Sequence, residues 1–283
     1  MKKLGKFVVG CMCLFLLSCS KKDSEAPLQT FHESPLITPV PAAIIEASGI
    51  AESKINPGFL WVQEDQNNPT QLYLLAHDGK TVRTISLKGI TNQDWEDIAL
   101  SGNDLYLADI GDNNKAFTSY TFYKFPEPPA SQDTVRNIEE IHFRYADGVH
   151  NAEAFLIDPE SRDIYIFTKS DVPAKIYKLA YPYHQNNNIA ELAGVLPYGP
   201  VVSAAISVDG MGIIIKTYLN LFYYTRAVKE SIAQVLQKSY TTLPYIVEPQ
   251  GEAVTIALHN EGYFTLSEKA GASEVKLYFY KKR

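Results

Sequence analysis

The chain has 283 residues, of which 46% are apolar and 12% aromatic, and its formal net charge is −6. This length can form one large all-β domain, and 18 tyrosines and 13 phenylalanines suit strands that pack sheet against sheet. An excess of acidic residues argues against nucleic acid or anionic lipid as a partner. The three cysteines all lie within residues 11–19, so we expect no disulfide framework in the domain.

The N-terminus has the order of an export signal. A basic start is followed by the apolar stretch 7–17, which is too short to span a bilayer, and the tetrapeptide Leu-Leu-Ser-Cys ends at Cys19. This tetrapeptide resembles the lipobox of bacterial lipoproteins, which implies cleavage of a signal peptide (1–18) and lipidation of Cys19. Ser20 resembles the residue that follows the cysteine in lipoproteins sorted to the outer membrane. The alternative is an ordinary secretory signal with a chance cysteine.

We therefore expect an exported lipoprotein in the outer membrane of a Gram-negative bacterium. Its only membrane contact should be its N-terminal acyl anchor. Residues 19–35 are polar with two prolines and predict a flexible tether. The remaining residues, 36–283, are predicted to form one domain, which we expect to be a monomer.

That domain contains a module that returns about every 50 residues. Each copy begins with a short apolar strand that starts with a small or acidic residue: SGIA at 48–51, EDIA at 96–99, AEAF at 152–155, SAAI at 203–206 and GEAV at 251–254. A repeat of this length built from strands is typical of a propeller blade. The sequence thus predicts an all-β β-propeller.

Turn residues divide the modules into strands. The predicted strands are 48–51, 59–63, 71–76 and 81–87; 96–100, 104–109, 120–125 and 138–145; 153–157, 163–168, 175–179 and 189–196; 204–208, 212–217, 221–226 and 240–246; and 253–258, 262–267 and 275–280. Helical spacing predicts a short surface helix within 229–238. The fifth module lacks a fourth strand, and an open ring would expose two sheet edges. We expect 36–45 to supply that strand and to close a five-bladed ring; the alternative is six blades, with a degenerate blade between 96 and 152.

In a propeller, the starts of the first strands and the ends of the second strands meet on one face. Acidic and amide residues that this rule places around the central mouth are Glu64, Asp65, Asp94, Asn113, Asp171 and Glu268. The candidate metal ligands are Glu96, Asp109, Asp112, Glu153 and Glu252. Carboxylates this close repel unless they are protonated, paired or neutralised by a cation, and oxygen ligands favour calcium. The alternative is that these acids bind strand-end amides and lysines.

Three residues near this face are candidates for catalysis: His150, Lys169 and Lys216. The histidine could position water and a lysine could stabilise developing negative charge. The alternative for His150 is a structural, hydrogen-bonded role. No serine-hydrolase, zinc or phosphate-loop motif is present.

Gly251-Glu252-Ala253-Val254 together with the strand at 262–268 is similar to the blades of phytase-like propellers. From about residue 40 the chain resembles the group of phytase-like and esterase-like propellers, SdiA-regulated lipoproteins and SMP-30/NHL propellers. This resemblance implies a calcium-dependent phosphoester or ester hydrolase, although the chain lacks the dense basic set that phytate requires. Because no catalytic constellation is complete, the sequence favours a binding or scaffold module that presents its mouth to a glycan, phosphoester or protein ligand.

Overall fold

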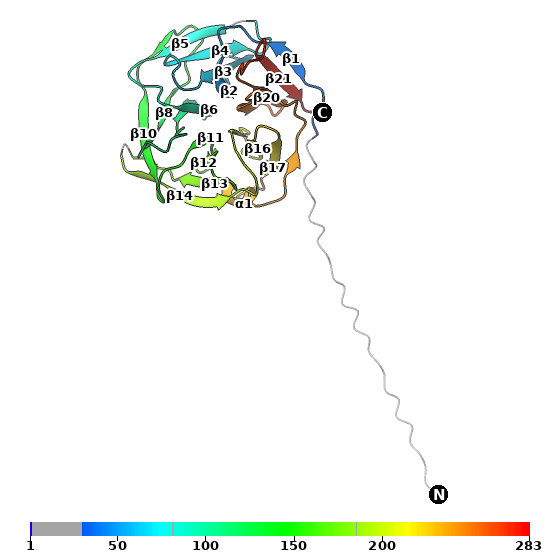
Figure 1. The fold of residues 1–283 in the computed structure, drawn as a ribbon. Helices are drawn as coiled ribbons and strands as arrows, with labels where there is room; N and C mark the ends of the chain where they lie inside the picture. The colour runs from blue at the N-terminus through cyan, green and yellow to red at the C-terminus, as the bar shows by residue number, and fades with distance from the viewer. Residues whose placement is uncertain (2–29, 81, 185) are drawn as a thin grey trace.

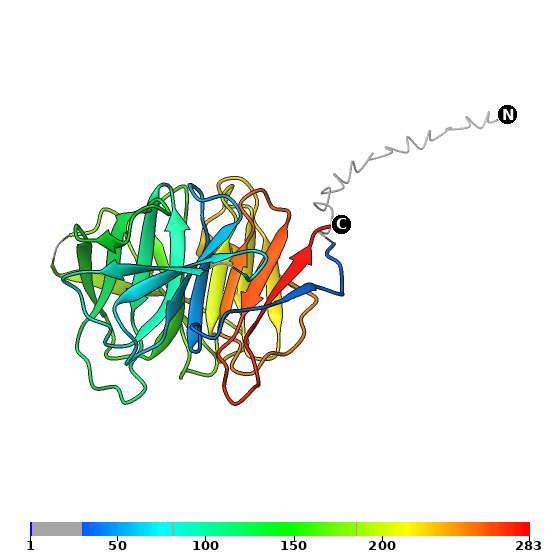
Figure 2. The same cartoon turned by 90° about the horizontal axis from the view of Figure 1, so that it is seen from above.

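The computed structural model describes residue 1 and residues 30–80, 82–184 and 186–283. Within these ranges the chain forms antiparallel sheets that surround a central axis, seen along the axis in Figure 1 and at right angles to it in Figure 2. The prediction of an all-β β-propeller is confirmed.

The strands of each blade run from the axis outward, with sequential neighbours paired antiparallel. Blade 1 contains β2 (Ala47–Glu52), β3 (Phe59–Glu64), β4 (Gln71–Ala76) and β5 (Val82–Leu87). Blade 2 contains β6 (Trp95–Ser101), β7 (Asp104–Asp109), β8 (Tyr120–Pro126) and β10 (Glu139–Tyr145). Blade 3 contains β11 (Ala152–Ile157), β12 (Ile164–Thr168), β13 (Lys175–Leu179) and β14 (Asn188–Val195).

The last two blades have shorter outer strands. Blade 4 contains β15 (Ser203–Ile206), β16 (Gly212–Lys216), β17 (Leu221–Thr225) and β18 (Thr241–Thr242). Blade 5 contains β19 (Ala253–Ile256), β20 (Gly262–Leu266), β21 (Lys276–Lys281) and β1 (Leu36–Pro39). The predicted helix is a single turn, α1 (Ile232–Val235), which begins with a capping box formed by Ser231 and Gln234.

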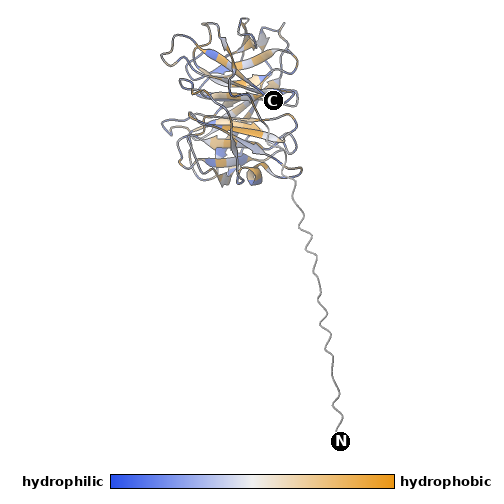
Figure 3. Ribbon diagram, turned by 90° about the vertical axis from the view of Figure 1, so that its right-hand side faces the viewer, coloured by the Kyte–Doolittle hydropathy of each residue, from blue (hydrophilic) through white to orange (hydrophobic). Residues whose placement is uncertain are grey.

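Apolar packing between adjacent blades holds the ring together. The inner strands β2, β6, β11, β15 and β19 neighbour one another in a closed circle. A separate buried hydrophobic cluster fills each junction between adjacent blades, and Figure 3 shows the apolar residues along the strands. Trp61 and Trp95 both belong to the cluster between blades 1 and 2, which assigns these side chains to core packing.

The N-terminal segment closes the ring, as predicted. Strand β1 pairs antiparallel with β21, with Leu36 opposite Phe279, so the last blade gains its fourth strand from the start of the domain. The contact continues outward through a bridge between Phe31 and Lys282. The Phe31 ring lies 5.0 Å from the Tyr263 ring, centroid to centroid, and is buried between blades 4 and 5.

The long interval between the second and third modules does not form a sixth blade in the described part of the chain. It crosses to blade 1, where β9 (Thr134–Val135) pairs parallel with β5. The carboxylate of Glu127 accepts hydrogen bonds from Trp61 Nε1 at 2.8 Å and Ser53 Oγ at 2.5 Å. The extra residues therefore join two neighbouring blades.

Candidate functional site

The starts of the inner strands bring acidic residues together at one end of the channel. Glu96 and Glu153 are the second residues of β6 and β11, and Glu252 directly precedes β19. Each of these three residues is at most 4% exposed. We define the acidic mouth as these residues together with their neighbours from the adjoining loops: Asp65, Asp94, Glu96, Glu153, Glu252 and Glu268.

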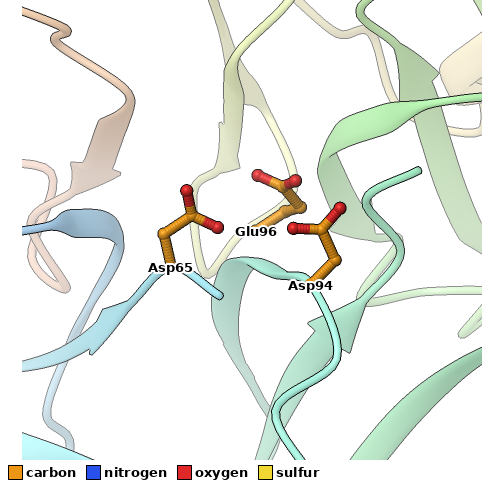
Figure 4. Close-up of side chains that lie close together, drawn as sticks. All are labelled: Asp65, Asp94 and Glu96. Atoms are coloured by element: carbon orange, nitrogen blue, oxygen red, sulfur yellow. The ribbon is translucent and has the colours of Figure 1, made fainter. Parts of the chain in front are cut away.

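Within the acidic mouth, Asp65, Asp94 and Glu96 form one group. One oxygen of each carboxylate lies within 4.8 Å of the others, and Figure 4 shows the three side chains pointing toward one another. None of the three makes an ion pair with a lysine, arginine or histidine that the structure describes. Asp94 Oδ1 is buried and has no hydrogen-bond partner among those residues. The group offers oxygen ligands without a directly paired basic side chain among the described residues, although the charge of Lys169 partly offsets the rise that burial causes in the pKa values of Asp65 and Asp94.

A close approach of the backbone shapes this group. Gly111 lies against Asp94 and Glu96, and a side-chain carbon at this position would collide with both carboxyl groups. The backbone N–H of Gly111 also donates to the carbonyl oxygen of Asp94 at 3.1 Å. Glycine therefore lets the loop after β7 cover the two acids, and a larger residue would displace their carboxyl groups.

Lys169 neutralises the other part of the acidic mouth. Its ammonium group pairs with Glu153 and lies 3.3 Å from Glu252 Oε1. The Tyr218 hydroxyl also donates to Glu252, and the Glu268 carboxyl is hydrogen-bonded to the same residue. These carboxylates raise the pKa of Lys169 despite the burial of its amine, so this lysine remains charged.

Burial and mutual repulsion raise the pKa values of Asp65, Asp94, Glu96, Glu153 and Glu268. Burial is the main cause in every case, and it raises the pKa of Asp65 to about 6 and that of Asp94 to about 7. The pKa values of Glu153 and Glu268 rise to about 8, and that of Glu96 lies well above its usual range. Without a cation, the acidic mouth therefore holds protons at neutral pH.

Two predicted metal ligands hold local structure instead of joining the group. The Asp109 carboxylate accepts a hydrogen bond from the backbone N–H of Asp94 at 2.8 Å. The Asp112 carboxylate accepts from the backbone N–H groups of Ala116 and Phe117, at 2.6 and 3.0 Å. Both acids therefore fix the loops that carry Asp94 and Gly111.

Other residues predicted for the mouth are also engaged in hydrogen bonds. Glu64 Oε1 accepts from the backbone N–H of Ile45 at 2.7 Å. Asn113 Oδ1 accepts from the side-chain amide of Asn151 at 3.1 Å. These contacts connect the segments around the acidic mouth and do not add ligands to the carboxylate group.

The three predicted catalytic residues lie in different surroundings. His150 is buried, with Nδ1 3.0 Å from Asp171 Oδ2 and Nε2 2.8 Å from the Tyr177 hydroxyl. Lys216 is fully buried, 3.7 Å from Glu248 Oε2. Of the three, only Lys169 contacts the acidic mouth.

A further acid, Asp97, lies among the inner strands and was not one of the candidate metal ligands or mouth residues. Its carboxylate accepts hydrogen bonds from Ser203 Oγ at 3.1 Å and from the backbone N–H of Ile98 at 2.9 Å. It also accepts from the backbone N–H groups of Phe155 and Ala204, so it joins blades 2, 3 and 4. The sequence holds a signal for it, because the other four modules have glycine or alanine at this position.

Comparisons with known proteins agree on the fold. No protein-family model matches the chain, and the search of curated proteins found no match. The structure is similar to an auxiliary nutrient binding protein from Bacteroides thetaiotaomicron, with a TM-score of 0.50 and 9% identity over 84% of this chain and 70% of that chain. It is also similar to a luciferin-regenerating enzyme, with a TM-score of 0.51 and 9% identity over 88% of this chain and 95% of the other. At these identities the likeness shows the β-propeller fold.

Proposed function

We propose that this chain is a ligand-binding β-propeller whose acidic mouth binds calcium. The observation that carries the proposal is the group of Asp65, Asp94 and Glu96, whose oxygens lie within 4.8 Å of one another without a basic partner in the described chain. Carboxylate oxygens are the ligands of hard cations, and a site without histidine or cysteine favours calcium over zinc.

The electrostatic balance of the acidic mouth supports this proposal. Lys169 supplies one positive charge, and it is committed to Glu153 and Glu252. Asp94 Oδ1 and Glu153 Oε2 are both buried without a hydrogen-bond partner among the described residues, and such atoms are costly when ionised. A divalent cation would satisfy these oxygens and allow the carboxyl groups to lose their protons.

Binding is a better account than hydrolysis. The alternative, a calcium-dependent phosphoester or ester hydrolase, would require a base and a cation beside the bound ion. The side chain of Lys216 has no exposed surface, and His150 is held by Asp147, Asp171 and Tyr177. Lys169 does contact the acidic mouth, but its ammonium group is engaged with Glu153 and Glu252. The mouth is therefore proposed to present calcium to a glycan, phosphoester or protein ligand.

Calcium-dependent stability tests the site. Adding calcium to protein prepared in chelator should raise the melting temperature by about 5 °C or more when calcium exceeds its Kd a hundredfold. Asp94→Asn should remove most of this shift, because it replaces a charged ligand. The exposed substitution Glu191→Gln is the control and should keep the full shift. A melting temperature that does not respond to calcium would refute the site.

We also propose that the protein is an outer-membrane lipoprotein anchored through Cys19, which lies outside the described residues. In the described part of the chain, no helix is long and apolar enough to cross a membrane. Cys19→Ala should abolish labelling by a palmitate analogue and release the protein from the membrane fraction. Unchanged labelling in the variant would rule out this anchor.

A further inference from the structure

A cavity separate from the acidic mouth lies at the seam where the first and last blades meet. Its volume is about 240 Å³. The residues that form its walls come from three parts of the chain, and we call it the seam pocket after Leu36, Thr38, Glu52, His77, Phe264 and Phe279. Glu52 ends the inner strand whose start lies near the acidic mouth, so the seam pocket belongs to the opposite end of the propeller.

The polar wall of the seam pocket has two atoms that face each other without a hydrogen bond. His77 Nε2 lies 3.6 Å from Glu52 Oε1, and this nitrogen is buried with no partner among the residues described. The other Glu52 oxygen accepts from the backbone N–H of Leu258 at 2.7 Å, which fixes the carboxylate. Burial lowers the pKa of His77, so its imidazole is neutral at neutral pH. An ammonium group that lies beside the two atoms, in the pocket, could donate to both.

The apolar wall is aromatic. The rings of Phe264 and Phe279 are stacked with centroids 4.4 Å apart, and the His77 ring lies 4.6 Å from Phe264. Gly262 allows the Phe279 ring to lie directly against the backbone, where any side chain would collide with it. Phe264 is buried between Phe279 and His77, so the partly exposed Phe279 ring is the aromatic surface open to a ligand. Such a surface packs against an aromatic ring and attracts a nearby cation.

The acidic residues of the seam pocket favour a positively charged ligand. Glu52 and the exposed Glu261 are acidic, and the lining contains no lysine or arginine. The volume is below that of a site for a drug-sized molecule, so the ligand must be small. A small molecule with one positive charge, several hydrogen-bond donors and a single aromatic ring meets all these conditions.

We propose that the seam pocket binds a small primary arylalkylamine, with its ammonium group beside Glu52 Oε1 and His77 Nε2 and its ring against Phe279. This site is independent of calcium in the acidic mouth. Because β1 contributes Leu36 and Thr38 to the wall, a bound amine contacts both ends of the ring and stabilises its closure.

Calorimetric titration of the full chain with 2-phenylethylamine at pH 7.5 tests the proposal. We expect one saturable site with a Kd on the order of 0.1–1 mM, as suits a ligand of this size. The uncharged analogue 2-phenylethanol should bind about tenfold more weakly, because it lacks the charge-assisted hydrogen bonds. Glu52→Gln should weaken amine binding by a similar factor, and the exposed control Glu274→Gln should leave it unchanged.

Two further measurements separate this site from the acidic mouth and from misfolding. Saturating calcium and the mouth variant Asp94→Asn should not alter the Kd for the amine, and competition by calcium would place the amine in the mouth instead. In the unaltered protein labelled with ¹⁵N-histidine, the amine should shift the His77 imidazole signal. An unshifted signal at saturation, or equal affinities for the amine and the alcohol, would overturn the proposal.

Discussion

The two ends of the central channel differ although the same five strands form both. At one end, the strand starts carry the acids of the acidic mouth. At the other end, which we call the lower channel, the residues that follow on these strands are apolar: Ile50, Ile98, Leu156, Ala205 and Val254. The ring is therefore held by the later part of each inner strand, which leaves the strand starts free to carry costly buried charge.

Asp97 forms the boundary between these two ends. Gly49 lies so close that a side-chain carbon there would be 2.8 Å from Asp97 Oδ1. The equivalent positions in the remaining modules are Ala154, Ala204 and Ala253. The axis thus has room for one large side chain, and a carboxylate there accepts hydrogen bonds from three blades.

Of the changes considered, replacing Asp97 should lower the free energy of unfolding most. Asp97→Ala leaves the buried N–H groups of Phe155 and Ala204 without their acceptor, and we expect a loss of about 3 kcal/mol or more in the free energy of unfolding. Denaturant titration measures this loss. The exposed control Asp133→Ala should change stability by less than about 0.5 kcal/mol. Equal values for the two variants would show that the carboxylate is not a link between blades.

Truncating an apolar side chain of the lower channel should cause the next largest loss of stability. Ile98 is 3% exposed and packs in the cluster between blades 1 and 2. Ile98→Ala should cost about 2–4 kcal/mol through lost burial and a residual cavity. The calcium-dependent rise in melting temperature should remain, because Ile98 is not a ligand. If the rise disappeared, the two ends of the channel would not be independent.

The fold could be predicted from the sequence because its main signals are local. The five module starts, the turns between strands and the unpartnered N-terminal strand together specified the ring and its closure. The strand β9 was missed, since only two residues pair with β5. Its position depends on Glu127, which binds Trp61 across 66 residues of sequence, and no local pattern encodes that contact.

The candidate site could be predicted only in part. The sequence analysis placed Asp65, Asp94 and Glu96 at the mouth, because the starts of the first strands and the ends of the second strands meet on one face of a propeller. It could not separate these acids from Asp109 and Asp112, whose oxygens bind nearby backbone N–H groups. That distinction depends on loop geometry, and so the sequence left both roles open.

The pH dependence of stability should distinguish the acidic mouth from the apolar end. In the folded chain the pKa of Asp94 is about 7 and that of Glu153 about 8, above the values of about 4 expected after unfolding. A raised folded pKa contributes stability that is present below about pH 4 and is lost as the pH rises through 7 to 8. In chelator, the melting temperature should therefore be several degrees higher at pH 5 than at pH 8.

Calcium should reverse this trend, because it competes with protons for the same oxygens and binds more tightly as the pH rises. The measurement is a series of thermal melts from pH 5 to pH 8, with chelator and with calcium. A melting temperature that rises with pH in chelator would mean that the acids are ionised and paired in the folded protein. The raised pKa values would then be wrong.

The smallest effect is expected for Glu96→Gln, two residues before Ile98 on the same strand. Burial and the neighbouring acids raise the pKa of the Glu96 carboxyl well above its usual range, which disfavours its charged form, and glutamine has nearly the same shape and no charge. In chelator at pH 8 the variant should be as stable as the parent, or more stable by up to about 1 kcal/mol. In calcium it should be the less stable of the two, because it lacks one charged ligand.

Thermal melts of the parent and the Glu96→Gln variant, in chelator and in calcium, measure this crossover. A variant that is less stable in chelator as well would show that the Glu96 charge supports the fold, and the acidic mouth would then be a structural element rather than a site kept for a cation.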